Sequence, residues 1–188
     1  MQYSKPTQIL VDEHEVITSV LNAVEAVATR GDARGEFPQE FFEKAFDFFP
    51  TFADKCHHAK EETHLFPLLE TRGIPRDGGP IGCMLSEHEE GRKHVAAVRE
   101  ALQQTAKGDL AARETARREA LAYVALLRQH ILKENQILFV IADQQMTAQD
   151  KEDLCREFQH AEQHAVSPGT HEKYLALATE LCAAAALD

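Results

Sequence analysis

Apolar residues recur every three or four positions along most of the chain, and the strict alternation that is typical of strands is almost absent. Sparse glycine and proline residues divide this pattern into segments. The four long segments predict helices at about Pro6–Thr29, Pro38–Glu70, Pro80–Lys107 and Leu110–Gln144. We therefore expect an all-α protein built on an up-down-up-down four-helix bundle.

The breaks between these segments carry residues that commonly end helices. Gly31–Gly35 follows the first segment, Thr71–Pro80 follows the second, and Gly108–Asp109 follows the third. Pro50 lies inside the second segment, and it is expected to kink that helix because proline lacks the backbone N–H that an interior position requires.

Two shorter helices are expected after the fourth long one. Thr147 and Asp150 have the spacing of a capping box, which predicts the start of a fifth helix. Ser167–Gly169 separates this helix from a last one at the C-terminus. The predicted organisation is one bundle over residues 1–146 and a helical extension over residues 147–188 that packs on it.

Each of the four long helices has an apolar stripe that is interrupted by residues of the types that bind metals. Burying carboxylates in such a core costs several kcal/mol each unless a positive charge is nearby. A cation bound by these side chains would supply that charge. The candidate ligands are His14 in the first helix, His57 and Glu61 in the second, His88 in the third, and His130 and Glu134 in the fourth.

The candidate ligands also belong to an internal repeat. The pattern H-x-x-K-E-x-x-x-L-F occurs at His57–Phe66 and again at His130–Phe139, and each copy follows an E-H-E triplet at a nearly equal distance. Two equivalent halves predict two metal ions with a glutamate from each half between them. A mixed set of imidazoles and carboxylates suits iron better than magnesium or calcium, whereas zinc and manganese remain chemically possible.

Composition narrows the range of partners. The chain has 31 acidic and 20 basic residues and a formal net charge of −11, which disfavours nucleic acid and anionic membranes as partners. No apolar run approaches the roughly 20 residues of a membrane span, and the N-terminus MQYSKPTQIL is too polar for a signal peptide. We therefore expect a cytoplasmic protein, in which the dispersed Cys56, Cys83, Cys155 and Cys182 are reduced thiols.

Four stretches carry a family resemblance: LVDEHEVI, FADKCHHAKEETHLFPLLE, GGPIGCMLSEHEEGRKHV and HILKENQILF. Over about its first 145 residues the chain resembles hemerythrin-like (HHE cation-binding) proteins. The resemblance implies an up-down four-helix bundle around a non-haem di-iron site. It implies the same six ligands that the stripes indicate, namely His14, His57, Glu61, His88, His130 and Glu134.

The chain departs from the oxygen-carrying hemerythrins at two positions. Arg92 stands where they have a second histidine one turn after the ligand of the third helix, and Glu134 follows His130 at a spacing of four where they have an aspartate at five. Arginine stays protonated and cannot donate a lone pair to a metal. We therefore expect one iron to keep an open coordination position, to which Gly91 gives room unless this glycine serves only helix packing.

An open iron position predicts a protein that binds or senses a small ligand such as dioxygen or nitric oxide. Two alternatives stay open: a di-iron oxidoreductase that acts on peroxide or nitric oxide, and an iron-handling protein. The expected partner is thus a small gaseous or peroxide ligand, with no nucleic acid and no membrane.

Several further residues have candidate roles. His58 with Glu62 has the same spacing as His57 with Glu61, but the register of the repeat selects the latter pair, so His58 is expected to be solvated or to support a ligand. For His64 and Tyr123 a structural role is favoured over a contact to the metal ligands. His94, in the third long helix, is expected to face away from the site. In the C-terminal helices, His160 and His164 with His171 beyond them could form an adventitious metal site, but a solvated face is favoured.

Overall fold

The computed structural model describes residues 3–30, 37–164 and 169–187, and these residues form helices and turns without any strand. The first long helix is α1 (Lys5–Arg30). The second is continuous from Gln39 to Thr71 and comprises α2 (Gln39–Phe48), η1 (Phe49–His58), η2 (Glu61–Leu65) and α3 (Phe66–Thr71). The third is α4 (Pro80–Thr105). The fourth comprises α5 (Leu110–Lys133), η3 (Glu134–Leu138) and α6 (Phe139–Gln145). The two shorter helices are α7 (Ala148–His164) and α8 (Thr170–Leu187).

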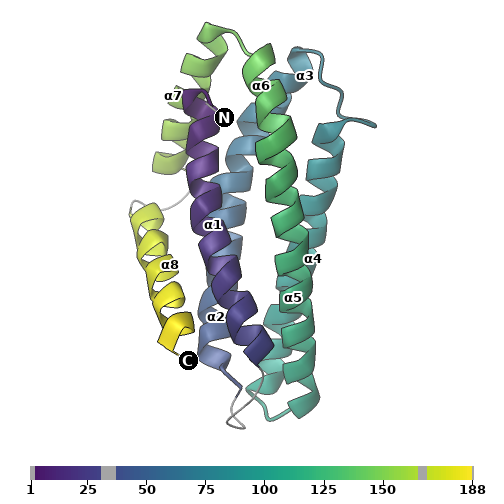
Figure 1. The fold of residues 1–188 in the computed structure, drawn as a ribbon, viewed down its shortest axis with the longest axis vertical. Coiled ribbons are helices and arrows are strands. Elements are labelled where there is room, and N and C mark those ends of the chain that lie inside the picture. The colour runs from purple at the N-terminus through teal and green to yellow at the C-terminus, as the bar shows by residue number, and fades with distance from the viewer. Residues whose placement is uncertain (1–2, 31–36, 165–168, 188) are drawn as a thin grey trace.

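The four long helices run side by side with alternating direction, which confirms the predicted bundle (Figure 1). α4 packs on α5, and α1 packs on α5 and on the helix that contains α2 and η1. α7 and α8 lie along the outer side of α1 (Figure 1), where α7 also contacts η2 and α8 also contacts α2. None of the described helices is both long enough and apolar enough to cross a membrane.

Local sequence signals set the starts of two of the helices. The carboxylate of Asp109 accepts hydrogen bonds from the amides of Ala111 and Ala112 at 2.9 and 3.3 Å and so caps α5. The predicted capping box is confirmed, because the Thr147 amide donates to Asp150 Oδ2 at 2.8 Å and the Asp150 amide donates to Thr147 Oγ1 at 3.2 Å. The predicted breaks at Gly31–Gly35 and Ser167–Pro168 lie outside the described residues.

The second and fourth helices widen into π-helical turns where they carry the repeated motif. Pro50 is the second residue of η1, where the hydrogen bonding changes from α-helical to π-helical. The kink expected at this proline stays a prediction. Glu61 begins η2 and Glu134 begins η3, and both segments are five residues long. The internal repeat in the sequence is therefore also a repeat in the backbone.

The hydrophobic core consists of two clusters with a polar layer between them. On α1, Val11 belongs to one cluster and Ile17 to the other, and His14 lies between them. On α4, His88 lies in the same way between Met84 and Val95. The bundle thus holds its buried polar side chains at one level along its axis.

Candidate metal centre

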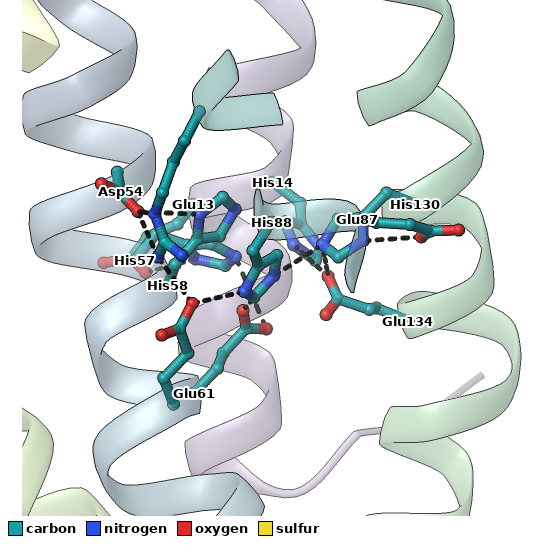
Figure 2. Close-up of polar contacts among 12 residues, drawn as sticks. Glu13, His14, Asp54, His57, His58, Glu61, Glu87, His88, His130 and Glu134 are labelled. Atoms are coloured by element: carbon teal, nitrogen blue, oxygen red, sulfur yellow. Dashed lines mark hydrogen bonds and ion pairs between the residues drawn. The ribbon is translucent and has the colours of Figure 1, made fainter. Parts of the chain in front are cut away.

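All six predicted ligands lie in the polar layer of the bundle, where their side chains point toward one another (Figure 2). Their potential ligand atoms form two groups, in each of which these atoms lie within 4.8 Å of one another. Both groups are completely buried and they share Glu61. The first group contains His14, His57, Glu61 and Glu134, and the second contains His58, Glu61, His88 and His130.

The two glutamates lie between the groups. Glu61 Oε1 is 3.6 Å from His57 Nε2, and Glu61 Oε2 is 3.6 Å from His88 Nε2. Glu134 Oε2 is 3.2 Å from His14 Nε2 and 3.1 Å from His130 Nε2. Each glutamate therefore faces one imidazole of each group, as a carboxylate that bridges two cations does.

The histidines share one orientation, in which Nδ1 is bound outside the cluster and Nε2 faces into it. His14 Nδ1 donates to Asn135 Oδ1 at 2.8 Å, and His57 Nδ1 donates to Glu13 Oε2 at 2.9 Å. Matching bonds run from His88 Nδ1 to Glu62 at 2.7 Å and from His130 Nδ1 to Glu87 at 3.0 Å. A proton on each Nδ1 leaves the lone pair of each Nε2 free, which is the usual arrangement of histidine ligands to metals.

His88 Nε2 and His130 Nε2 lie 3.0 Å apart and can share a hydrogen bond, but the other inward-facing atoms of the six predicted ligands lack hydrogen-bond partners. His14 Nε2, His57 Nε2 and both carboxylate oxygens of Glu61 and Glu134 are buried without any hydrogen bond. Buried polar atoms of folded proteins are nearly always satisfied, and an unsatisfied carboxylate is especially unfavourable. Cations at the two groups would satisfy these atoms together, so the donor set fits a pair of metal ions.

The lysine of the repeated motif has the same contact in both halves. Lys60 Nζ donates to Glu13, the residue that orients His57, and Lys133 Nζ donates to Glu87, the residue that orients His130. The motif H-x-x-K-E together with the E-H pair therefore encodes a histidine, its carboxylate acceptor and a lysine that neutralises this acceptor.

Comparison with known proteins agrees with this geometry. The family model described as "Hemerythrin HHE cation binding domain" matches residues 5–142. The chain belongs to the hemerythrin HHE cation-binding family. Its match to this family confirms the resemblance that the four sequence stretches indicate, and α7 and α8 lie beyond the matched residues.

Relatives of this hemerythrin HHE protein include "Uncharacterized protein Mb2018" of Mycobacterium bovis and "Uncharacterized protein Rv1995" of Mycobacterium tuberculosis. Each is 25% identical to it over 153 residues. The aligned region covers 81% of this chain and 59% of each relative, so the chain spans less than two thirds of their length. No solved structure shows a significant match.

His58 is a member of the metal-binding cluster that the sequence prediction missed. The expectation of a solvated side chain is wrong, because His58 is only 5% exposed and its ring stacks on that of His88 at a centroid distance of 3.8 Å. Its Nδ1 donates to Asp54 Oδ1 at 3.4 Å, which follows the pattern of the other histidines. The adjacent pair His57–His58 was the signal in the sequence, but a regular α-helix would direct only one of the two inward.

Arg92 binds the carboxylates that orient two of the imidazoles. Its guanidinium donates to Asp54 at 2.7 Å and to Glu62 at 2.7 Å, and these carboxylates are the acceptors for His58 and His88. The expected open iron position stays a prediction, and the structure adds that His58 brings an imidazole to the second group while Arg92 holds the acceptors of two imidazoles. The Arg92 side chain is 34% exposed.

Burial and mutual contact shift the ionisation of the cluster. Burial raises the pKa of Glu61 well above its ordinary value, and the nearby Glu134 adds to this effect. Burial acts in the same direction on Glu134, but His130 and His14 outweigh it and hold the pKa of Glu134 well below its ordinary value. Burial alone would lower the pKa of His130, whereas Glu134 and Glu87 raise it to about 9. Without a metal, a proton on Glu61 and the charge of His130 thus offset the buried carboxylates, and a bound cation can take the same role.

The other candidate histidines lie away from the two groups. His64 Nδ1 is 3.8 Å from Glu157 of α7, and His94 Nδ1 donates to Glu119 at 2.9 Å. His171 joins Glu13 and Glu162 in a third group of potential ligands, but the Lys60 ammonium already binds both of these carboxylates. His160 is exposed, and the side chain of His164 lies outside the described part of the structure.

Proposed function

We propose that this hemerythrin HHE domain binds two iron ions, one in each group, and presents the second to a small ligand such as dioxygen or nitric oxide. The observation that carries the proposal is the shared orientation of the imidazoles. Four of them bind an acceptor through Nδ1 and turn Nε2 toward two buried carboxylates, whose oxygens have no hydrogen bond.

The donor set supports iron. Imidazole nitrogens and carboxylate oxygens together suit iron, and carboxylates between two groups suit a dinuclear site. His14 and His57 would hold the first ion, His58, His88 and His130 the second, and Glu61 with Glu134 would bridge them. When bound, a ferrous pair supplies electrons and coordination positions for a small ligand, while the protein fixes the imidazoles and keeps the site buried.

The surroundings of the two groups support access at the second group. On the side of the first group, α7 covers the bundle, and Lys60 is only 1% exposed because it also donates to Glu162 of α7 at 2.6 Å. Lys133, at the equivalent position of the second half, is 35% exposed. A cavity of about 230 Å³ is lined by His58 and His88 of the second group. A small ligand that enters the protein here reaches the second group directly.

The decisive experiment is anaerobic reconstitution with ferrous iron, followed by metal analysis and optical titration with dioxygen, nitric oxide and peroxide. We expect about two iron ions per chain and a reversible spectral change with dioxygen or nitric oxide. Repeated turnover of peroxide or nitric oxide would instead show an oxidoreductase, and iron that is easily lost without any response to gases would show an iron-handling protein. A reproducible single zinc ion per chain would refute the di-iron assignment.

A matched pair of variants shows whether the cluster holds the metal. His88→Ala removes an inward-facing imidazole of the second group, and His94→Ala removes a half-buried histidine of the same helix that binds Glu119 instead. We expect His88→Ala to lower the iron content and His94→Ala to leave it unchanged. Equal iron contents of the two variants would contradict the proposed site.

A further inference from the structure

The cavity beside the second group is larger than a diatomic gas requires. Its volume is about 230 Å³, whereas one water-sized group occupies about 30 Å³ and a cavity of about 150 Å³ accommodates benzene in another protein. At this scale the cavity has space for roughly seven or eight non-hydrogen atoms. Its size therefore indicates an organic molecule rather than a diatomic ligand alone.

The walls of this cavity are largely apolar. The lining includes Phe49 and Pro50 of η1, Val95 of α4 and Leu127 of α5. Tyr123 is packed against Phe49 at a ring distance of 4.8 Å. A molecule that fills this space has an apolar body, because apolar walls of this kind offer few hydrogen-bonding groups to a polar one.

Gly91 keeps the inner part of the cavity open. It lines the cavity one turn after His88, and a Cβ atom at this position would approach Tyr123 Cε2 to 3.3 Å. The absence of a side chain thus serves both of the roles that the sequence left open, since it permits close packing and leaves space next to the histidines.

Among the residues that the structure describes, one positive charge in the lining of the cavity has no partner. Asp54 and Arg92 pair with each other at 2.7 Å, and Glu87 pairs with Lys133. Arg99 also lines the cavity, but within the described residues its side chain forms no hydrogen bond or ion pair. The unpaired guanidinium gives the cavity a site for an anionic group, and guanidinium binds carboxylates with two parallel hydrogen bonds.

The positions along α4 place this charge away from the histidines. His88, Gly91, Val95 and Arg99 follow one another at helical spacing on one face of α4, and the rise from His88 to Arg99 is about 16 Å. A ligand with its anionic group at Arg99 therefore extends its apolar body toward His88. A neighbouring cavity on the other side of Arg99 is lined by Glu43 and Asp47, whose carboxylates would repel an acid.

We propose that this cavity binds a small monocarboxylic acid with an apolar chain, its carboxylate on Arg99 and its chain directed toward His58 and His88. The inference rests on the proposed function only in one respect: the apolar end of the ligand then lies beside the proposed second metal ion. It gives the site a ligand class beyond dissolved gases, namely aliphatic acids of about eight carbon atoms, whose alkyl part of about seven carbon atoms fills the cavity while the carboxylate lies at the exposed Arg99.

The test uses calorimetric titration of the full iron-loaded chain with octanoate and, separately, with 1-octanol. We expect octanoate to bind more tightly than octanol. Arg99→Gln should weaken octanoate binding at least about tenfold, as expected for the loss of a charge-assisted hydrogen bond, and should leave octanol binding unchanged. Arg118→Gln is the matched control, since this exposed arginine of α5 pairs with Glu119 and does not line the cavity.

A second variant tests whether the apolar part of the ligand lies in the cavity. Ala96 lines the cavity and is exposed, so Ala96→Phe should fill the space without disturbing the core and should abolish binding of both compounds. The inference would be overturned if either Arg99→Gln or Ala96→Phe left octanoate binding unchanged, or if the parent protein did not bind octanoate.

Failure of the inference and failure of the metal site remain distinguishable. Iron content and the optical response to nitric oxide are measured on the same samples, and both should be the same in Arg99→Gln as in the parent protein. A chain that binds iron and nitric oxide but no octanoate contradicts only the acid ligand. A protein that binds octanoate but takes up no iron contradicts only the metal site. Octanoate binding can be measured in this case because the titration does not require iron and can also be done in the presence of a chelator.

Discussion

Lys60 and Lys133 offer a comparison in which one substitution is made at equivalent positions of the two halves. Each lysine follows its motif histidine by three residues and donates to the glutamate that binds this histidine. They differ in solvent exposure, because α7 packs over Lys60 and supplies Glu162 as a second acceptor at 2.6 Å. Substitution with methionine keeps most of the aliphatic side chain and removes the ammonium group in both cases.

The expected magnitudes follow from burial. Burial alone would lower the pKa of Lys60, but Glu13 and Glu162 outweigh it and raise this pKa, so the ammonium stays charged. Lys60→Met then leaves Glu13, which is itself buried, without its main counter-charge. Breaking a buried ion pair costs about 3–5 kcal/mol, whereas a pair as exposed as Lys133 with Glu87 contributes about 0–1 kcal/mol. We therefore expect Lys60→Met to lower the free energy of unfolding by about 3 kcal/mol more than Lys133→Met does.

The assay is unfolding in urea, with thermal unfolding as a second measure, for the iron-loaded chain and again in excess chelator. A difference of about 3 kcal/mol corresponds to roughly 6–12 °C in melting temperature for a protein of this size. Persistence of the difference in chelator shows that it does not arise from loss of metal. Equal destabilisation by the two substitutions would refute the reasoning, because it would mean that α7 does not bury Lys60.

Three further predictions concern the cluster and the C-terminal helices. Glu61→Ala should remove a bridging carboxylate, lower iron occupancy in elemental analysis, and abolish the rise in melting temperature that iron gives the parent protein, since metal binding stabilises the folded state; an unchanged iron content would contradict its role. Arg92→His should fail to add a ligand and should weaken iron binding in a chelator competition, because it breaks the contacts to Asp54 and Glu62; tighter binding would show that position 92 reaches the metal. Thr147→Ala should destabilise α7 by about 1 kcal/mol through loss of the N-cap. Amide exchange in α7 should then be faster in the variant than in the parent protein, while exchange in α4 stays the same. Equal exchange in α7 of both proteins would exclude this cap.

The sequence by itself determined the helices, most of their ends and six members of the cluster. Helix periodicity and caps are local properties, so Asp109 and the Thr147–Asp150 box define helix starts without reference to the rest of the chain. The repeated motif selected His57 with Glu61 and His130 with Glu134, because these residues occupy the same positions in both copies and interrupt an otherwise apolar helix face. The division into residues 1–146 and 147–188 stays a prediction.

Only the tertiary structure decided the place of His58. Consecutive residues of an α-helix lie about 100° apart around its axis, so a regular helix that buries His57 turns His58 away. The π-helical turns of η1 are wider, which reduces this angle and brings both rings into the cluster. Arg92 contributes from α4 by holding Asp54, a contact between helices that periodicity does not encode.

The difference between the two halves of the bundle is likewise a property of the fold. Lys60 and Lys133 stand in the same motif, and nothing in their neighbouring residues distinguishes a lysine that is 1% exposed from one that is 35% exposed. The distinction arises because α7, some hundred residues after Lys60, packs against one half and places Glu162 on this lysine. Such contacts depend on how distant helices pack, and the energy of a buried charge is fixed only when every helix around it is in place.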